Sequence, residues 1–418
     1  MQTIINEFKR GWTVLFGCFI GIGVSLVSLV YYSGGIWIKP WQQEFGWDRA
    51  DIGLGQGLGT LTIVLGAPLA GRLIDKFGLK ITATLSLLLY AGSIFLITKM
   101  NGSLILFYGL NILVALTALP STPLGFTRAV NAWFQKHKGL ALGIALTSTG
   151  IAATLLPKLL TPYVEEHGWR AGYLILFLIV LVAIPLIWFL IKEQPGVEDQ
   201  DDQATVPSQV GYILQEVIRQ ATFWKLAVIF FLISTAILGL IPSFIPLLQD
   251  AQLDADQVGS LAAVLGLSVM IGRLLTGFLI DRFFAPRVVA IVFTFVAIGC
   301  YTLGLGGISF ALLGAIALGF AVGAEVDLIG YFTAKYFGMK HYGSIYGVMY
   351  SVFSMGAIIS PALAGFIWDK TGNYDLALVL AAVLVSLAAL LSLFLPRFTE
   401  TMPSTKNLSS INQVEALN

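Results

Sequence analysis

GRLIDKFG at residues 71–78 returns as GFLIDRFF at residues 277–284, an offset of 206 residues. A second pair follows at an offset of 204 residues: GLALGIALTSTGIAATLLP (139–157) and GSIYGVMYSVFSMGAIISP (343–361) share the spacing of two glycines and a proline. Two matched pairs in the same order indicate two repeated halves with the same orientation. The repeat therefore predicts one bundle that is duplicated along the chain.

The composition places both halves in a lipid bilayer. Of the 418 residues, 57% are hydrophobic and 11% are charged, whereas a soluble domain carries about 25% charged residues. The sequence predicts an all-α membrane protein with twelve transmembrane helices in two pseudo-symmetric six-helix bundles. Each predicted span is close to the roughly 20 residues that cross a bilayer, and the spans cover residues 12–38, 50–73, 80–98, 103–133, 137–163, 169–192, 223–249, 257–281, 287–306, 308–336, 340–367 and 374–396.

Polar stretches divide the chain into four parts. Residues 1–192 form the N-terminal six-helix bundle, and residues 223–396 form the C-terminal one. Residues 193–222 read as a cytoplasmic linker with a short amphipathic helix at its end, because apolar side chains there alternate with Gln and Arg. Residues 397–418 are polar and aperiodic, which predicts a disordered cytoplasmic tail.

The distribution of basic residues predicts the topology. Loops on the same side as the N-terminus hold most of the Lys and Arg, and the positive-inside rule places such loops in the cytoplasm. We therefore expect a multi-pass protein of the cell membrane with both termini in the cytoplasm. The basic residues on that side are Arg72, Lys76, Lys80, Lys136, Lys138, Lys192, Arg219, Lys225, Arg282, Arg287, Lys335 and Lys340.

Several function classes are excluded at this stage. A net charge of +1 without basic clusters argues against nucleic acid as a partner. Cys18 and Cys300 each lie within an apolar run, so neither a disulfide framework nor a Cys/His metal site is expected. The chain has no GxxxxGK[ST] phosphate loop and no HExxH motif, so we expect no enzyme and no cofactor.

The stretch GAEVDLIGYFTAKYFG (323–338) places Glu325 and Asp327 inside an apolar run. Acids at membrane depth are costly and mark transport pathways or structural pairs. Counted from the cytoplasmic end of its span, Asp327 lies at the depth of Arg273, and Glu325 lies half a turn deeper. We expect Asp327 to pair with Arg273 and Glu325 to be the free titrating group for proton coupling, with a permanent structural pair as the alternative.

Two arginines are candidates for substrate binding. Arg273 lies about eight residues, roughly 12 Å, from the cytoplasmic end of its span. A guanidinium there can hold a carboxylate with two parallel hydrogen bonds; the alternative is a contact with Asp281 or a helix end. Arg128 lies closer to the cytoplasmic end, so two alternatives remain open: a role in substrate binding or in an inner gate, and a side chain that extends to cytoplasmic water.

The first repeat resembles the loop motif of the major facilitator superfamily. The resemblance implies a motif that fastens the cytoplasmic side in one conformation, through acids at helix ends. It also implies that spans one, four, seven and ten line the cavity, which makes Tyr31, Tyr32 and Tyr331 candidate substrate contacts; ordinary packing is the alternative. The gate residues that the motif assigns are Gly71, Asp75, Lys76, Gly78, Asp281 and Arg282.

Within that superfamily the chain resembles the branch of monocarboxylate transporters and oxalate/formate antiporters. The resemblance rests on stretches distributed along nearly the whole chain: Gly11-Trp12, FGWDRADI (45–52), KGLALGIALTSTG (138–150), HGWRAGYL (167–174) and GRLLTGFLIDR (272–282).

The chain also departs from this branch at three charged positions. The span-one Lys of monocarboxylate transporters is missing near Tyr31 and Tyr32, and Val269 stands where they have an Asp. The span-eleven Lys of oxalate/formate antiporters is missing between Gly343 and Phe366. Proton handling is therefore expected in the 323–338 stretch.

These features predict a secondary active transporter that carries a small organic anion, a monocarboxylate, by proton symport. The two bundles rock about the substrate site, and the expected partners are the anion, the proton and the lipid bilayer, with a monomer as the working unit. An organic anion exchanger is the nearest alternative. A proton-coupled drug exporter fits less well, because two buried arginines would repel a cationic cargo, and a receptor without transport activity is more distant still.

Overall fold

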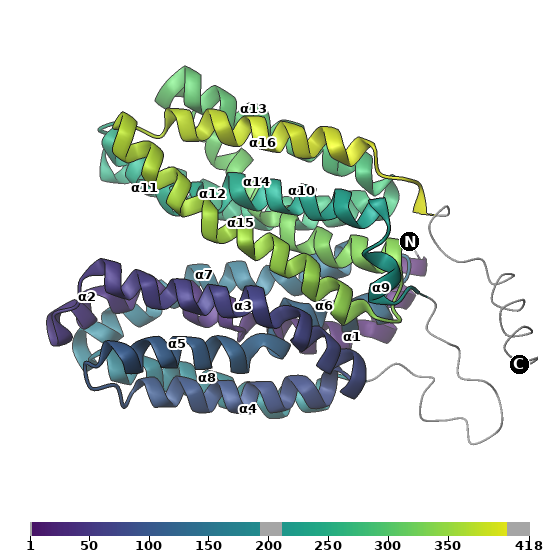
Figure 1. Ribbon diagram of the computed structural model, residues 1–418, viewed down its shortest axis with the longest axis horizontal. Coiled ribbons are helices and arrows are strands. Elements are labelled where there is room, and N and C mark those ends of the chain that lie inside the picture. Colours follow the sequence, from purple (N-terminus) through teal and green to yellow (C-terminus); the bar gives the residue numbers. More distant parts are fainter. Residues whose placement is uncertain (1, 193–210, 399–418) are drawn as a thin grey trace, which may run out of the picture.

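The computed structural model describes residues 2–192 and 211–398. Helices of the N-terminal bundle and of the C-terminal bundle lie side by side as two layers of roughly parallel rods (Figure 1). The predicted tail after residue 398 and most of the predicted linker, residues 193–210, lie outside the described residues. In the described part of the linker, the Tyr212 amide donates to the Phe337 carbonyl at 2.9 Å, which ties this segment to the C-terminal bundle.

The N-terminal bundle contains two broken spans. The first span passes through a π-helical turn, where Ser28 Oγ donates to the Ile22 carbonyl at 2.6 Å and competes with the regular helical pattern. The fourth span is interrupted by a short 3-10 turn before α6. The elements are α1 (Gln2–Gly23), η1 (Val27–Tyr31), α2 (Gly34–Phe45), α3 (Arg49–Phe77), α4 (Leu79–Ile97), α5 (Leu104–Ala118), η2 (Leu119–Ser121), α6 (Pro123–Trp133), α7 (Lys138–His167) and α8 (Trp169–Leu190).

The C-terminal bundle repeats this order after the short helix α9 (Leu214–Val217), which covers only part of the expected amphipathic helix. Its elements are α10 (Ala221–Ile237), α11 (Leu240–Asp250), α12 (Ala255–Arg282), α13 (Ala285–Gly306), η3 (Gly307–Phe310), α14 (Ala311–Phe332), η4 (Thr333–Phe337), α15 (Tyr342–Thr371) and α16 (Asp375–Leu393).

The described helices account for twelve crossings. Ten segments are long and apolar enough to span a membrane, and one of them, Ala285–Phe337, contains both α13 and α14. The first span, made of α1, η1 and α2, adds the remaining crossing. The prediction of an all-α membrane fold with twelve spans in two bundles is therefore confirmed.

The two bundles meet along α3 with α15 and along α7 with α12. We call the side where α1 begins and α16 ends the terminal side, and the other end the opposite side (Figure 1). A Cβ on Gly71 would lie 1.9 Å from the Gly343 carbonyl oxygen, so the two backbones touch there. Among the described glycines, those whose Cβ would meet backbone of the other bundle are Gly71, Gly139, Gly143, Gly277, Gly343 and Gly347.

These six glycines all lie on the halves of the four helices nearest the terminal side. Farther along the same helices, a Cβ on Gly53 or Gly57 of α3, or on Gly259 or Gly266 of α12, meets no atom within 4 Å. The backbone contact between the bundles is therefore a feature of the terminal half of the molecule.

Candidate functional site

Arg273 lies at the centre of the contact between the bundles, on α12, and is only 4% exposed. Its Nε donates to the Gly323 carbonyl at 3.2 Å and lies 3.4 Å from Asp327 Oδ1. Both partners are on α14 of the same bundle. The ion pair expected from the depths of Arg273 and Asp327 is therefore present.

The other side of the guanidinium contacts the N-terminal bundle. Arg273 Nη1 donates to Thr149 Oγ1 at 2.8 Å and to the Leu146 carbonyl, both on α7. Arg273 Nη2 lies 3.5 Å from the Val322 carbonyl oxygen. One side chain thus connects three helices and both bundles, because a planar guanidinium projects its donors in several fixed directions.

Glu325 and Asp327 are 2% and 3% exposed. Asp327 Oδ1 and Oδ2, and Glu325 Oε2, accept no hydrogen bond from the described residues. The contact between Asp327 and Arg273 is therefore mainly electrostatic. Glu325 interacts electrostatically with Arg273, with Tyr32 of the N-terminal bundle and with Tyr350 of α15.

Tyr32 connects this cluster to solvent. Its side chain is 37% exposed, and its hydroxyl interacts with Thr149 and lies in the field of Arg273 and Glu325. Tyr31 points toward α3 instead, where its hydroxyl is 2.9 Å from Thr60 Oγ1. Of the two tyrosines, Tyr32 is therefore the one that lies beside the charged cluster.

A cavity of about 820 Å³ extends from Tyr32 toward the opposite side. Its described walls come from α2 and from the last part of α7, and they end at the start of α8. This volume falls in the range of small-molecule binding sites. The polar and charged lining residues are Tyr32, Lys39, Gln43, Glu44, Thr161, Glu165 and Trp169.

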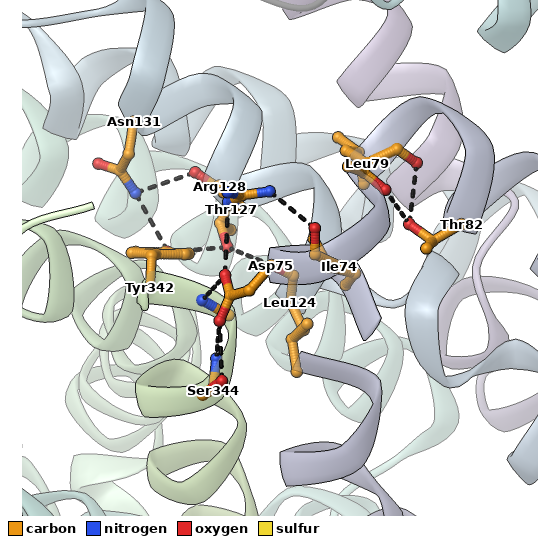
Figure 2. Close-up of polar contacts among 12 residues, drawn as sticks. Ile74, Asp75, Leu79, Thr82, Leu124, Thr127, Arg128, Asn131, Tyr342 and Ser344 are labelled. Atoms are coloured by element: carbon orange, nitrogen blue, oxygen red, sulfur yellow. Dashed lines mark hydrogen bonds and ion pairs between the residues drawn. The ribbon is translucent and has the colours of Figure 1, made fainter. Parts of the chain in front are cut away.

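The terminal side is closed by two acids at equivalent positions of the repeats. Asp75, near the end of α3, accepts hydrogen bonds from the Gly343 amide at 2.9 Å and from the Ser344 amide and hydroxyl at 2.8 Å (Figure 2). Asp281, near the end of α12, accepts from the Gly139 and Leu140 amides at 2.8 Å. Each carboxylate thus sits at the N-terminus of a helix of the other bundle, where the helix dipole favours negative charge.

Arg128 belongs to this closed end and is not in contact with Arg273. Its Nε lies 3.7 Å from Asp75 Oδ1 and its Nη1 donates to the Ile74 carbonyl at 2.9 Å (Figure 2). Tyr331 also lies away from the central cluster, because its hydroxyl donates to the Ile280 carbonyl at 2.8 Å. The structure therefore does not bring these two predicted substrate contacts to the site.

Of the other residues of the predicted gate motif, Gly78 shapes the backbone, and the two basic residues are exposed. Gly78 has a φ of 77°, a backbone conformation that favours glycine, and it separates α3 from α4. Lys76 and Arg282 are exposed, with their charges over the rings of Phe77 and Phe278. The closure is thus made by Asp75, Asp281 and Gly71, while the two basic residues lie beside it.

Sequence reasoning did not single out two sets of polar residues. Thr149 lies within the quoted stretch 138–150, and no feature of the sequence distinguishes it there. At the terminal side, Asn131 Nδ2 donates to Tyr342 Oη at 3.2 Å (Figure 2). It also donates to the Gly330 carbonyl at 3.2 Å. The Tyr342 hydroxyl donates to Thr127 Oγ1 at 3.0 Å, which joins α6 to α15.

A duplicated six-span bundle with charged residues buried where the halves meet is the architecture of a membrane transporter. The family model described as Major Facilitator Superfamily matches residues 12–282 and 229–415. The chain belongs to the Major Facilitator Superfamily.

Known relatives refine this placement. Monocarboxylate transporter 12-B of Danio rerio is 24% identical over 96% of this chain and 90% of its own length. The uncharacterized MFS-type transporter YhjX of Escherichia coli is 26% identical over 72% of this chain and 75% of its own length. The crystal structure of the transporter FucP in its outward conformation has the same fold, with a TM-score of 0.72 and 18% identity over 94% of this chain and all of FucP. The predicted resemblance to the monocarboxylate transporter branch is thus confirmed.

Proposed function

We propose that the protein carries a small organic anion, a monocarboxylate, together with a proton. One observation carries the proposal: Arg273 and two acids are buried at the contact between the bundles, and Tyr32, which lies in the field of Arg273 and Glu325, lines a large cavity. Intramembrane charges of this kind mark transport pathways. The similarity to proteins named monocarboxylate transporters supports the choice of anion.

The charges of the cluster explain why the anion needs a proton. Arg273, Asp327 and ionised Glu325 together carry a net charge of −1. A bound carboxylate alone would increase the charge to −2 in a buried site, which is costly. A carboxylate that arrives with a proton on Glu325 leaves the net charge at −1, so the loaded and the empty site have the same charge.

The positive-inside rule assigns the terminal side to the cytoplasm. The acids Asp75 and Asp281 then close the cytoplasmic side, with Arg128 as part of this gate, and the cavity faces the outside. The outward conformation named for FucP supports this assignment. Rocking of the two bundles would break both acid contacts and open the site to the cytoplasm.

Proteoliposomes provide the test. We expect wild-type protein to accumulate labelled lactate when the outside is acidic and the inside is neutral. Glu325→Gln should reduce this accumulation about 10- to 100-fold, equivalent to roughly 1.4–2.8 kcal/mol, and should retain lactate exchange at equal pH. Asp327→Asn should reduce both activities, because it leaves Arg273 without its charged partner.

Glu166→Gln is the matched control, because this acid is exposed on the opposite side. Full gradient-driven uptake by both the Glu325 and the Asp327 variants would refute the proton-coupling assignment. Uptake that requires lactate inside the vesicle and ignores the pH gradient would identify an anion exchanger.

A further inference from the structure

We infer that the substrate carboxylate and α7 compete for Arg273, and that Thr149 is the positioning residue through which substrate binding loosens the closed side of the molecule. The inference rests on the proposed function for the identity of the ligand. Its structural basis is independent: Arg273 is at once the predicted anion-binding group and a link between the two bundles.

The internal repeat shows that this arginine is not needed to close the contact. Ala67 on α3 and Arg273 on α12 are separated by the repeat offset of 206 residues, and Gly347 and Gly143 by the offset of 204. A Cβ on Gly347 would lie 2.4 Å from the Ala67 carbonyl oxygen, and one on Gly143 would lie 3.0 Å from that of Arg273. In the N-terminal half, Ala67 allows the same close approach of the two backbones. The guanidinium of Arg273 in the C-terminal half is therefore not required for that approach.

The hydrogen bonds of Arg273 leave no forked edge free for a carboxylate. Both hydrogens of Nη1 point to α7, to Leu146 and Thr149, while Nε and Nη2 face α14. A carboxylate that binds through two parallel hydrogen bonds needs an N–H from each of two nitrogens. It must therefore displace either α14, within the same bundle, or α7, which belongs to the other bundle.

Thr149 puts the α7 edge within reach of the cavity. Its hydroxyl accepts from Arg273, donates to the Leu146 carbonyl at 2.9 Å and interacts with Tyr32, which is exposed in the cavity. Thr149 therefore joins the α7 side of Arg273 to a residue that lines the cavity. Once the carboxylate accepts the hydrogen bonds of Nη1, Arg273 no longer donates to Leu146 and Thr149 of α7.

Loss of that contact acts on the conformational equilibrium. The bonds to Leu146 and Thr149 exist only while α7 and α12 are in contact, so they favour the conformation with a closed terminal side. A ligand that replaces them binds better when the terminal side loosens, and by linkage the loosening and the binding promote each other. Substrate binding itself thereby shifts the equilibrium toward the conformation with an open terminal side.

Thr149→Val tests this competition, because it removes the hydroxyl and keeps the shape of the side chain. We expect lactate to bind about 3- to 10-fold more tightly to purified protein in detergent. Without lactate, the share of molecules with an open terminal side should rise by a similar factor. The share of open molecules is measured from the distances between spin labels at Arg72→Cys on α3 and Lys340→Cys before α15. The measurement is made in the wild-type and Thr149→Val backgrounds.

Two variants on α7 control for nonspecific effects. Thr147→Val removes a hydroxyl that bonds only within its own helix, to the Gly143 carbonyl at 2.7 Å, and should change neither quantity. Thr149→Ser keeps the hydroxyl and should behave like the wild type.

Weaker or unchanged lactate binding by Thr149→Val, with unchanged label distances and an intact melting transition, would overturn the competition. A purely structural role for Thr149 predicts weaker or unchanged lactate binding together with a lower melting temperature. Failure of the proposed function gives a different result: wild-type protein then takes up no monocarboxylate, while the distances between labels still respond to Thr149→Val.

Discussion

Single carboxylates in this protein are held in two distinct ways. Asp327 and Glu325 are buried beside one guanidinium and accept few hydrogen bonds, which is the environment that the proposed proton coupling requires. Glu7, at the start of α1, is held by a set of donors: the Gln135 and Lys136 amides donate to its Oε1, and His137 Nδ1 lies 2.7 Å from its Oε2. The first arrangement favours change of charge, and the second favours a permanent anion.

Glu7 gives a pH-dependent prediction. Partial burial opposes its ionisation, but the two backbone amides and His137 outweigh this effect and hold the pKa of Glu7 below its usual value of 4.5. The ionised form therefore stabilises the fold fully above pH 4.5, and this contribution is lost as the pH falls through the lowered pKa. Glu7→Gln should reduce the melting temperature by about 1–3 °C at pH 7, and the difference from wild type should shrink below pH 4.5.

Thermal unfolding in detergent at pH 7, 5 and 4 measures this difference. Glu166→Gln changes an exposed carboxylate on the opposite side and should leave the melting temperature within error. A Glu7→Gln difference that stays constant over the whole pH range would contradict the assignment.

At the level of helices, contact between the bundles depends on the absence of side chains. Gly71 on α3 faces the backbone of α15, whereas Gly57 on the same helix faces open space. Glycine lets the two helices approach until their backbones touch, as in tightly packed membrane helices. The glycine pattern thus sets how close α3 and α15 come at the terminal side.

Gly71→Ala should push α3 away from α15, because its Cβ would lie 1.9 Å from the Gly343 carbonyl oxygen and backbone cannot yield there. We expect a tenfold or greater loss of uptake, roughly 1.4 kcal/mol, and a larger share of molecules open at the terminal side. The spin-label pair at Arg72→Cys and Lys340→Cys measures that share. Gly57→Ala is the control on the same helix and should slightly raise the melting temperature, because alanine favours a helix by about 0.5–1 kcal/mol. Equal behaviour of the two variants would show that the backbone contact is unimportant.

Across the whole molecule, two equivalent carboxylate contacts, which we call clasps, close the terminal side. Asp75 holds the start of α15, and Asp281 holds the start of α7. Each clasp joins opposite bundles, so both act on the same equilibrium between a closed and an open terminal side. A transporter needs this equilibrium to be nearly balanced, because a clasp that is too strong would trap one conformation.

Neutralising the two clasps should favour the open terminal side, and the free-energy effects of the two substitutions should add. Asp75→Asn and Asp281→Asn should each raise the ratio of open to closed molecules about fivefold, the factor that corresponds to roughly 1 kcal/mol. The double variant should raise this ratio about 25-fold if the sites act independently. The same spin-label pair reports the open fraction, and Asp250→Asn on the opposite side serves as control. A double variant no different from one single variant would show that only one clasp contributes.

The duplicated bundle, the number of spans and the depth of each charged residue follow from the sequence, because repeats, hydropathy and position along a helix are properties of a linear chain. Depth was enough to pair Arg273 with Asp327 on adjacent helices of one bundle. It could not show that Arg273 also binds Thr149 on α7, that Arg128 contacts Asp75, or that Tyr331 turns toward Ile280. These contacts depend on the rotation of each helix about its axis and on which helices meet across the two bundles, and only packing in three dimensions sets both.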